Sequence, residues 1–381
     1  MYYKREIERI VENYLSKNAP GKNALIIYGA RQVGKTTLIK EVLRKHPEGS
    51  QYYNCDYADV QEQFAYTNAG RFGSLVRGLK LLVLDEAQRI ENIGLVLKIL
   101  VDEFPHLQII ATGSSSFELS NKINEPLTGR KVEIMLFPLS IGELFAGKDA
   151  IERQRMIPEL LRFGSYPLAV NQSTEESEAY LKELTNSYLF KDIFTFQDLR
   201  KPEILGRLLQ LLAFQIGHEV SYHELASQLH VDQTVVQRYL DLLEKAFVVF
   251  RLPALSRNLR KEVSKTRKIY FYDLGVRNMI IKNFNDLSLR NDTGDLWENF
   301  CILERLKHLE YAGSAVNTFF WRTYDQKEID YIEERGGTLN AYECKWGDGK
   351  KVKEPKEFLS TYEGSSFEVV TPRTLEAFVF H

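Results

Sequence analysis

Short apolar runs alternate with amphipathic stretches along the first part of the chain. The apolar runs lie at residues 25–28, 80–84, 107–112 and 132–136, with a further strand-like run at 51–55. Such runs are typical of strands that are buried on both faces of a parallel sheet. Residues 7–15 and 37–43 have helical spacing instead. The alternation predicts βαβ units, and therefore an α/β domain over residues 1–148.

The pattern changes in the rest of the chain. Residues 149–200 have helical spacing and predict a helical connector or lid. Residues 201–255 contain two short amphipathic helices separated by a tight turn and followed by an apolar strand, a spacing that predicts a winged helix. Residues 256–381 contain a helix and hairpin-like strands with a turn at 336–337, and form the predicted last domain.

A phosphate-binding pattern follows the first apolar run. Residues 29–36 read G-A-R-Q-V-G-K-T, which matches G-x-x-x-x-G-K-[ST] between a strand and a helix. The glycines let backbone N–H groups turn toward phosphate oxygens, and the following helix adds its positive amino-terminal end. Lys35 would reach the β- and γ-phosphates, and the Thr36 hydroxyl would bind Mg²⁺. The residues predicted to contact a nucleoside triphosphate are Gly29, Ala30, Arg31, Gln32, Val33, Gly34, Lys35, Thr36, Thr37 and Asp85.

Two adjacent carboxylates end the apolar run at 80–84. Asp85, at the carboxyl end of the predicted strand, would hold Mg²⁺ through water. Glu86 would polarise the attacking water in line with the γ-phosphate. An acidic pair at this position favours water over another phosphoryl acceptor, and therefore predicts hydrolysis of the nucleotide.

Further polar residues are candidates for the same site. Thr112 and Ser114 end a strand that we expect between the phosphate-loop strand and the acidic strand, and either of them could sense the γ-phosphate. Arg130 precedes the strand at 132–136, where an arginine finger could lie. Such a residue stabilises transition-state charge and can come from a neighbouring subunit, so a homo-oligomer is one possible state. The alternative for Arg130 is a solvated surface arginine.

The predicted winged helix suggests a docking surface. Gln233, Thr234, Gln237 and Arg238 are expected on the outward face of its second helix. Only one of them is basic, and because binding to DNA normally needs several cations, DNA and protein both stay candidates for the partner. The segment 256–282 is locally basic and is the best candidate for an electrostatic DNA footprint, with a solvated loop as its alternative.

The last domain carries residues at a spacing typical of nuclease sites. Alternation places Glu343 and Lys345 on one face of their strand, and Asp330 lies on the preceding strand. Asp330 and Glu343 would bind a divalent metal ion with help from Glu298 on the upstream helix. Lys345 would orient the attacking water, as metal-assisted phosphodiester hydrolysis requires. A nuclease-like fold without cleavage is the alternative.

Composition narrows the functional classes. The 381-residue chain has 50 Lys and Arg against 52 Asp and Glu, and this net charge of −2 excludes a global polycation. Its 3 cysteines are too few for a disulfide framework or a zinc site. The start of the chain lacks a signal-peptide pattern, and no apolar run approaches the length of a membrane span. We therefore expect a soluble, cytoplasmic protein with no membrane partner.

Taken together, these motifs resemble a known family. The chain is similar to the AAA+-type P-loop ATPases of bacteria and archaea that carry a winged helix and a PD-(D/E)xK nuclease-like region, whose back half is catalogued as a domain of unknown function. The resemblance covers nearly the whole chain. It rests on the sequences G-A-R-Q-V-G-K-T-T-L, L-D-E-A-Q, A-T-G-S-S-S, L-T-G-R, Y-F-Y-D-L-G, W-E-N-F, E-I-D-Y and E-C-K-W, in this order.

The resemblance implies ATP binding and Mg²⁺-dependent hydrolysis, with Lys35, Thr36, Asp85 and Glu86 in the roles given above. It also implies that Glu298, Asp330, Glu343 and Lys345 form the nuclease-like set. Ile329 stands where the family pattern has a proline before its first acid, and this departure weakens the case for cleavage. The expected protein is an ATPase whose nucleotide state controls the C-terminal region and that acts on DNA. An ATP-gated nuclease and a non-catalytic docking switch are the alternatives.

Overall fold

A computed structural model describes residues 2–16, 23–65, 68–114, 123, 127–186, 202–257, 267–347 and 352–381. The chain divides into two compact units. The first contains Met1–Glu143 with Lys245–Phe247, and the second contains Leu144–Glu244 with Val248–His381. Part of the predicted connector, part of the basic segment and the serines at 115 and 116 lie outside the described residues.

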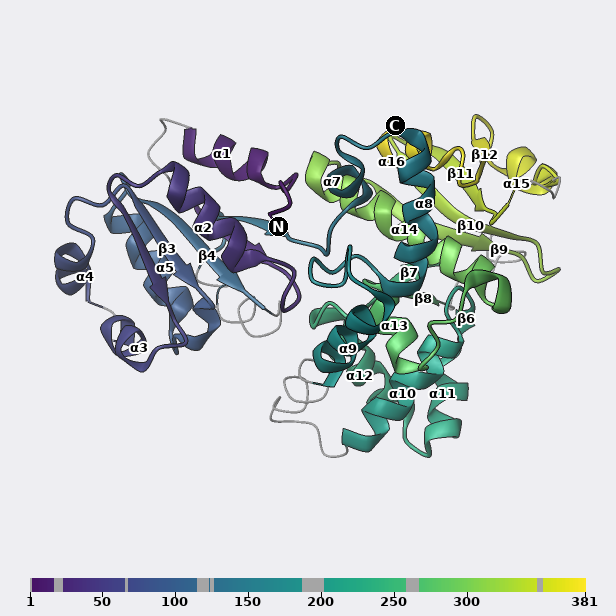
Figure 1. Ribbon diagram of the computed structural model, residues 1–381, viewed down its shortest axis with the longest axis horizontal. Helices are drawn as coiled ribbons and strands as arrows, with labels where there is room; N and C mark the ends of the chain where they lie inside the picture. The colour runs from purple at the N-terminus through teal and green to yellow at the C-terminus, as the bar shows by residue number, and fades with distance from the viewer. Residues whose placement is uncertain are drawn as a thin grey trace. The chain divides into compact units, whose positions relative to one another are not determined.

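The first unit is built on five parallel strands in the order β2-β3-β4-β1-β5. Strands β3 and β4 of this sheet are labelled in Figure 1. Their bounds are β1 Ala24–Tyr28, β2 Ser50–Asn54, β3 Leu81–Asp85, β4 Gln108–Gly113 and β5 Lys131–Met135. Every residue of β1 and β3 is buried, as the continuous apolar runs predicted. Strand β4 lies between β1 and β3. The prediction of an α/β P-loop fold with an extra strand between the two motif-bearing strands is therefore confirmed.

Helix α1, Glu8–Ser16, precedes the first strand of this unit. The helices that come after its strands are α2 Lys35–Lys45, α3 Ala58–Ala65, α4 Ala69–Leu75, the 3₁₀ turn η1 Ala87–Arg89, and α5 Ile93–Glu103. The short helix α7, Ile141–Phe145, begins in the first unit. Helix α2 begins directly at the phosphate loop with Gly34 as its N-cap, so the loop leads into a helix amino terminus as predicted.

The second unit begins with helices and a small sheet. The helices are α8 Ala150–Phe163, α9 Thr174–Leu184, α10 Pro202–Phe214, α11 Tyr222–Leu229, α12 Gln233–Lys245 and α13 Leu274–Ile280. The strands β6 Glu219–Val220, β7 Val249–Pro253 and β8 Arg267–Phe271 form an antiparallel sheet in the order β6-β8-β7.

Two sets of contacts cross the predicted domain boundaries. Strand β8 lies beyond the boundary expected at residue 255, yet it pairs with both β6 and β7 in one sheet. Helix α8, which belongs to the predicted connector, packs against α13, where the Asn278 side chain donates to the Leu161 and Arg162 carbonyl oxygens at 2.9 and 2.8 Å. Both sets of contacts join segments that are distant in sequence.

A four-stranded sheet completes the second unit. Its order is β12-β11-β10-β9, with β9 Asn317–Arg322, β10 Glu328–Arg335, β11 Thr338–Cys344 and β12 Ser366–Val370. Strands β10 and β11 are joined by Gly336 and Gly337, which both have positive φ, as a two-residue hairpin turn requires. The turn expected at these residues is confirmed. The remaining elements are η3 Leu287–Leu289, α14 Thr293–Ala312, α15 Lys356–Thr361 and α16 Leu375–Phe380.

Helix α14 forms the centre of this second unit. Every residue from Leu296 to Arg305 is buried, and the helix contacts β8, β11 and α16. A helix that is buried around its circumference must pair any charge that it carries. Accordingly, Arg305 binds both carboxylate oxygens of Glu333, at 2.6 and 2.9 Å. The same helix places Glu298 inside the unit.

Candidate functional site

The strand order of the first unit brings the predicted nucleotide residues to one edge of the sheet. The phosphate loop follows the end of β1, Asp85 ends β3, and β4 ends between them at Gly113. Because all five strands are parallel, these carboxyl ends lie at the same edge. The Gly29 amide donates to the Gly113 carbonyl oxygen at 3.3 Å, which ties the start of the loop to β4.

The phosphate loop requires both of its glycines. Gly34 has φ 102°, a conformation that side chains with a Cβ rarely adopt. A Cβ added at Gly29 would lie 2.3 Å from the Leu136 carbonyl oxygen, so no larger residue fits there without a shift of backbone. The side chain of Lys35 is 5% exposed and donates to the carbonyl oxygens of Gly29 and Ala30, at 2.8 and 3.0 Å. The loop therefore curls around the lysine that the sequence assigned to phosphate contact.

Charge surrounds this lysine at short range. Burial lowers the pKa of Lys35, while the negative charges of Glu86 and Asp85 act in the opposite direction. The Lys35 ammonium group therefore interacts with both predicted carboxylates as well as with the carbonyl oxygens of the loop.

Asp85 accepts hydrogen bonds from several residues of the site. Its side chain is 2% exposed and accepts hydrogen bonds from Thr36 Oγ1 at 2.7 Å and from Tyr52 OH at 2.9 Å. Thr112 Oγ1 donates to the other carboxylate oxygen. A hydroxyl and a carboxylate are hard oxygen ligands of the kind that Mg²⁺ prefers. Thr36 and Asp85 thus have the chemistry and the proximity that the predicted magnesium site needs.

Glu86 occupies an unusual backbone conformation. Its φ of 54° and ψ of 44° lie in the left-handed region, which costs a residue other than glycine about 1–3 kcal/mol. The conformation is held by a hydrogen bond from the Glu86 amide to Thr112 Oγ1 at 3.1 Å and by η1, which begins at the next residue. The Gln88 amide nitrogen contacts the Glu86 carboxylate at 2.5 Å and Ser114 Oγ at 3.2 Å.

These contacts separate the two sensor candidates. Thr112 bonds directly to both members of the acidic pair, to the side chain of one and the backbone of the other. Ser114 is connected to Glu86 only through Gln88 in the contacts described above. Of the two candidates, Thr112 therefore has the more direct contacts with Asp85 and Glu86.

Arg130 lies at the other edge of the sheet. It precedes β5, which pairs in parallel with β1 from Ala24 and Lys131 onward, whereas the phosphate loop follows the opposite end of β1. Its guanidinium, with the side chain 40% exposed, pairs with Asp102 at 2.6 Å. Strand direction thus places Arg130 away from the phosphate loop of its own chain, and both a role toward a neighbouring copy and the alternative of a solvated surface arginine stay open.

Sequence reasoning missed Tyr52, Gln88 and Arg5. Tyr52 lies on a strand that was predicted, and Gln88 lies in the motif after the acidic pair, but neither position was assigned a role. Arg5 is buried and donates to the Val33 carbonyl oxygen of the phosphate loop at 2.7 Å. No pattern in the amino-terminal sequence indicated that contact.

The second unit brings the predicted nuclease-like residues together around an unpredicted lysine. Lys268 on β8 is fully buried and contacts Glu298 at 2.8 Å, Glu328 at 2.5 Å and Asp330 at 3.9 Å. Tyr270 OH also donates to Glu298, at 2.6 Å. Burial opposes the charge of Lys268, but the three carboxylates outweigh burial and raise its pKa. Lys268 therefore pairs with carboxylates from two other elements of the same unit.

Glu343 and Lys345 complete this cluster. They form an ion pair at 2.6 Å, in agreement with their predicted position on one face of the strand. Burial raises the pKa of Glu343, and the charge of Asp330 raises it further. In the described part of the chain, however, no three His, Cys, Asp or Glu side chains are grouped so that they could hold a metal ion. Of the three carboxylates predicted to bind a metal, Glu298 and Asp330 instead pair with Lys268.

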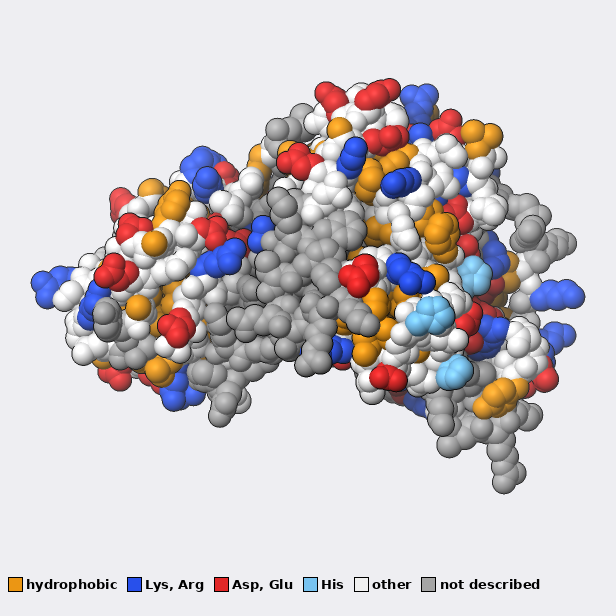
Figure 2. Space-filling view, turned by 90° about the horizontal axis from the view of Figure 1, so that it is seen from below, with side chains coloured by type: hydrophobic (Ala, Val, Ile, Leu, Met, Phe, Trp, Pro, Cys, Tyr) orange, Lys and Arg blue, Asp and Glu red, His pale blue; other side chains and the backbone are white. Residues whose placement is uncertain are grey.

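In the described part of the basic segment 256–282, three cations pair with carboxylates of the same chain. Lys268 and Arg277 are buried, and Arg277 pairs with Asp292 at 2.5 Å. Arg257 pairs with Glu334. On the face shown in Figure 2, acidic and basic side chains of the described residues are intermixed. Much of the described charge in this segment therefore serves internal pairing.

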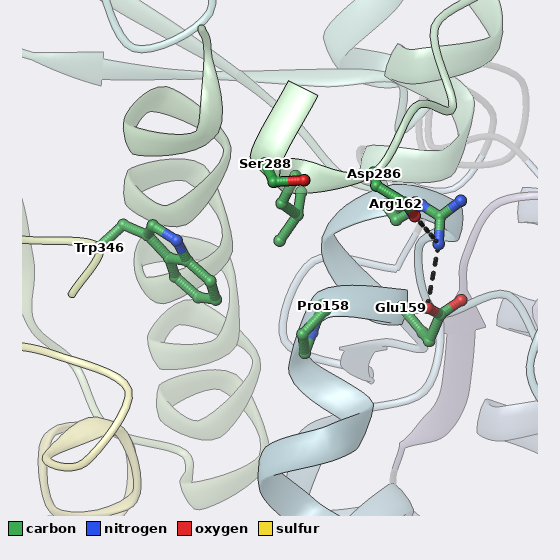
Figure 3. Close-up of a pocket in the computed structure, with 7 residues that line it drawn as sticks. Pro158, Glu159, Arg162, Asp286, Ser288 and Trp346 are labelled. Atoms are coloured by element: carbon green, nitrogen blue, oxygen red, sulfur yellow. Dashed lines mark hydrogen bonds and ion pairs between the residues drawn. The ribbon is translucent and has the colours of Figure 1, made fainter. Parts of the chain in front are cut away.

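A cavity of about 440 Å³ lies elsewhere in the second unit (Figure 3). It is lined by Pro158, Glu159, Arg162, Asp286, Leu287, Ser288 and Trp346. Arg162 spans Glu159 and Asp286 at 3.1 and 3.0 Å and donates to the Phe284 carbonyl oxygen. The charged groups that line the cavity thus already bind one another, and none of the predicted site residues lines the cavity.

Three family matches divide the chain. Residues 21–145 match a family described as an AAA domain, residues 154–287 a domain of unknown function (DUF8612), and residues 293–376 a domain of unknown function (DUF4143). Among solved structures, the Walker-type ATPase PABY2304 of Pyrococcus abyssi is similar, with a TM-score of 0.50 and 18% identity over 74% of this chain and 96% of that chain. At this identity the likeness supports the fold alone. Among the described residues, no helix is both long and apolar enough to cross a membrane.

Relatives extend over most of the chain. An uncharacterized protein of Haemophilus influenzae is 25% identical over 353 residues, 86% of this chain and 84% of the relative. Uncharacterized proteins of Mycobacterium tuberculosis and Mycobacterium bovis are each 30% identical over 325 residues, which cover 84% of this chain and 70% of each relative. This chain, with an AAA domain of P-loop fold in its first unit, therefore belongs to the same family as the two mycobacterial proteins.

Proposed function

We propose that this chain binds ATP at the phosphate loop and hydrolyses it with the help of Mg²⁺. The observation that carries the proposal is the contact of Thr36 with Asp85 at 2.7 Å, between residues 49 positions apart in the sequence. This contact joins the end of the phosphate loop to the acidic strand. Both groups are oxygen ligands, and they meet beside a buried lysine, as a site for a magnesium nucleotide requires.

Each residue of the site has a role that follows from its position. Lys35 and the loop amides would hold the phosphates and offset the charge that develops on them during hydrolysis. Thr36 and Asp85 would hold Mg²⁺, which neutralises phosphate charge when it is bound. Glu86 would orient a water molecule for attack, because it follows Asp85 at the same strand tip. Thr112 would link the position of the acidic pair to the γ-phosphate.

The same proposal gives Arg130 a role in a homo-oligomer. Strand direction keeps it from the phosphates of its own chain, so it would act on a nucleotide bound by a neighbouring copy. In this scheme the nucleotide state governs assembly and, through assembly, the second unit.

The direct test is phosphate release from ATP by the purified full-length chain. Turnover is expected with Mg²⁺ and is expected to disappear when the metal is chelated. If Arg130 acts on a neighbour, the activity per molecule rises with protein concentration. Calorimetry on the same sample measures nucleotide binding separately. A folded protein that neither binds nor hydrolyses ATP would overturn the proposal.

A second candidate function is docking of a partner by a winged helix in the second unit. The helices α10, α11 and α12, together with the strand order β6-β8-β7, support this reading of the predicted domain. The four residues assigned to the outward face of α12, Gln233, Thr234, Gln237 and Arg238, are all exposed. Since only one of them is basic, the surface favours a protein partner over DNA.

The docking proposal is tested by titrating duplex DNA against the full-length chain at several salt concentrations. A DNA partner requires affinity that falls steeply with salt, in proportion to the phosphates that are neutralised. We expect weak DNA binding that Arg238→Ala barely changes. Tight, salt-sensitive binding that is lost in this variant would show DNA to be the partner instead.

We do not extend the proposal to DNA cleavage by Asp330, Glu343, Lys345 and Glu298. Lys268 holds three carboxylates of the cluster by ion pairs, and Lys345 pairs with the fourth. An internal ammonium group at this place stabilises the fold of the unit, because buried carboxylates need a partner of opposite charge.

A further inference from the structure

The amino-terminal segment, residues 2–16, reaches the phosphate loop through one side chain. Arg5 is 5% exposed, and its guanidinium is held on three sides. Nη1 donates to the Val33 carbonyl oxygen at 2.7 Å, Nη2 donates to the Phe137 carbonyl oxygen at 2.7 Å, and Nε donates to Glu143 Oε1 at 2.9 Å. One residue therefore connects the loop, the chain after β5 and helix α7, all within the first unit.

The contact with Val33 determines how the loop presents its backbone. In a trans peptide the carbonyl oxygen and the next amide hydrogen point in opposite directions. When Arg5 holds the Val33 oxygen, the Gly34 N–H is directed away from Arg5. A Cβ added at Gly34 would lie 3.4 Å from Arg5 Nη1, so the guanidinium packs directly against this peptide unit. Amides of this loop are the donors expected to bind phosphate.

Arg5 is itself rigidly placed. The Glu143 side chain is fully buried and accepts hydrogen bonds from the amides of Glu6 at 2.8 Å and Ser140 at 3.0 Å, in addition to Arg5. A buried charge pair with its remaining lone pairs satisfied has little freedom to move. The orientation of the Val33–Gly34 peptide is thus fixed by residues that lie outside the phosphate loop.

We propose that Arg5 is a positioning residue of the nucleotide site, which orients the Val33–Gly34 peptide so that its amide faces the phosphates. The inference rests on the proposed binding of ATP. It makes the amino-terminal segment part of the site, although this segment precedes the AAA match at residue 21.

The test compares Arg5→Met with the matched control Lys45→Met. Lys45 also pairs with the amino-terminal segment, contacting Glu8 at 2.8 Å, but it is the last residue of α2 and lies at the opposite end of the helix from the phosphate loop. Hydrogen bonds of charged groups contribute about 1.5–3 kcal/mol. We therefore expect R5M to raise the Kd for ATP by roughly 10- to 100-fold and K45M to leave it unchanged. Arg5→Lys keeps the charge but not the fork of donors, and is expected to restore part of the affinity.

Hydrogen exchange of residues 29–36 without nucleotide provides a second readout that does not depend on ATP. Faster exchange is expected in R5M and R5K, but not in K45M. A folded R5M with the affinity and loop exchange of the wild type would overturn the inference. If R5M does not fold, R5K decides in the same way. A wild-type protein that binds no ATP would instead refute the proposed function, and the exchange data would still test the positioning of the loop.

Discussion

Replacing Glu86 with glutamine is expected to lower the kcat for ATP hydrolysis by about 10²- to 10⁴-fold, the usual contribution of a residue that accepts or orients a proton. The glutamine has nearly the same shape but cannot carry the negative charge that polarises water. The Kd for ATP should stay close to that of the wild type, because Glu86 is not among the groups that hold phosphate or Mg²⁺. Phosphate release and calorimetry measure the two quantities on one preparation.

The control for this experiment is Glu91→Gln. Glu91 follows η1, five positions after Glu86, and is exposed. The Glu91→Gln variant should keep full ATPase activity. The left-handed backbone at Glu86 tolerates glutamine no worse than glutamate, so both variants should fold and melt like the wild type. Undiminished turnover in Glu86→Gln would show that Glu86 has no role in hydrolysis. Gln88, which contacts the same carboxylate, would then be the next candidate.

Replacing Lys35 with alanine is expected to weaken ATP binding on the order of 100-fold or more, because each charged hydrogen bond to phosphate contributes about 1.5–3 kcal/mol. The variant also loses the contacts of Lys35 Nζ with the carbonyl oxygens of Gly29 and Ala30, which help to hold the loop closed. Hydrolysis should fall with binding. Calorimetric titration with ATP and ADP measures the loss directly.

Lys40→Ala provides the matched control, since Lys40 lies on the same helix and is exposed. Replacing Lys40 removes one positive charge without affecting the phosphate loop, so the nucleotide affinity should change little. If Lys35→Ala kept the affinity of the wild type while folded, the assignment of the phosphate site would be wrong. Equal losses of nucleotide affinity in both variants would indicate that Lys35 acts through long-range electrostatics rather than through contact with the phosphates.

The nucleotide site was predictable because its essential parts are local in sequence. The eight residues 29–36 are consecutive and run from the end of β1 into the start of α2, and Gly34 has the positive φ that this turn uses. Asp85 and Glu86 end a strand whose burial follows from its apolar composition. Strand and helix propensities act over a few residues, so such segments can be recognised without knowledge of the fold.

Contacts made by other parts of the chain were not predictable in this way. Arg5 reaches Val33 across 28 residues of sequence, and Tyr52 reaches Asp85 across 33. Lys268 was counted among the surface cations of a basic segment, but β8 lies within a sheet and turns this side chain into the carboxylate cluster. A charge count cannot tell a solvated lysine from a buried one, because burial depends on which strand lies next to it.

The amino-acid sequence alone determined the apolar strands, the phosphate loop with its lysine and threonine, and the acidic pair, since each depends on the chemistry of neighbouring residues. Tertiary structure alone decided that Arg130 lies at the far edge of the sheet, that Arg5 holds the loop, and that Lys268 lies among the carboxylates predicted to bind a metal. The physical reason is that strand order and direction bring distant residues together, and these depend on the packing of the whole unit rather than on any single segment.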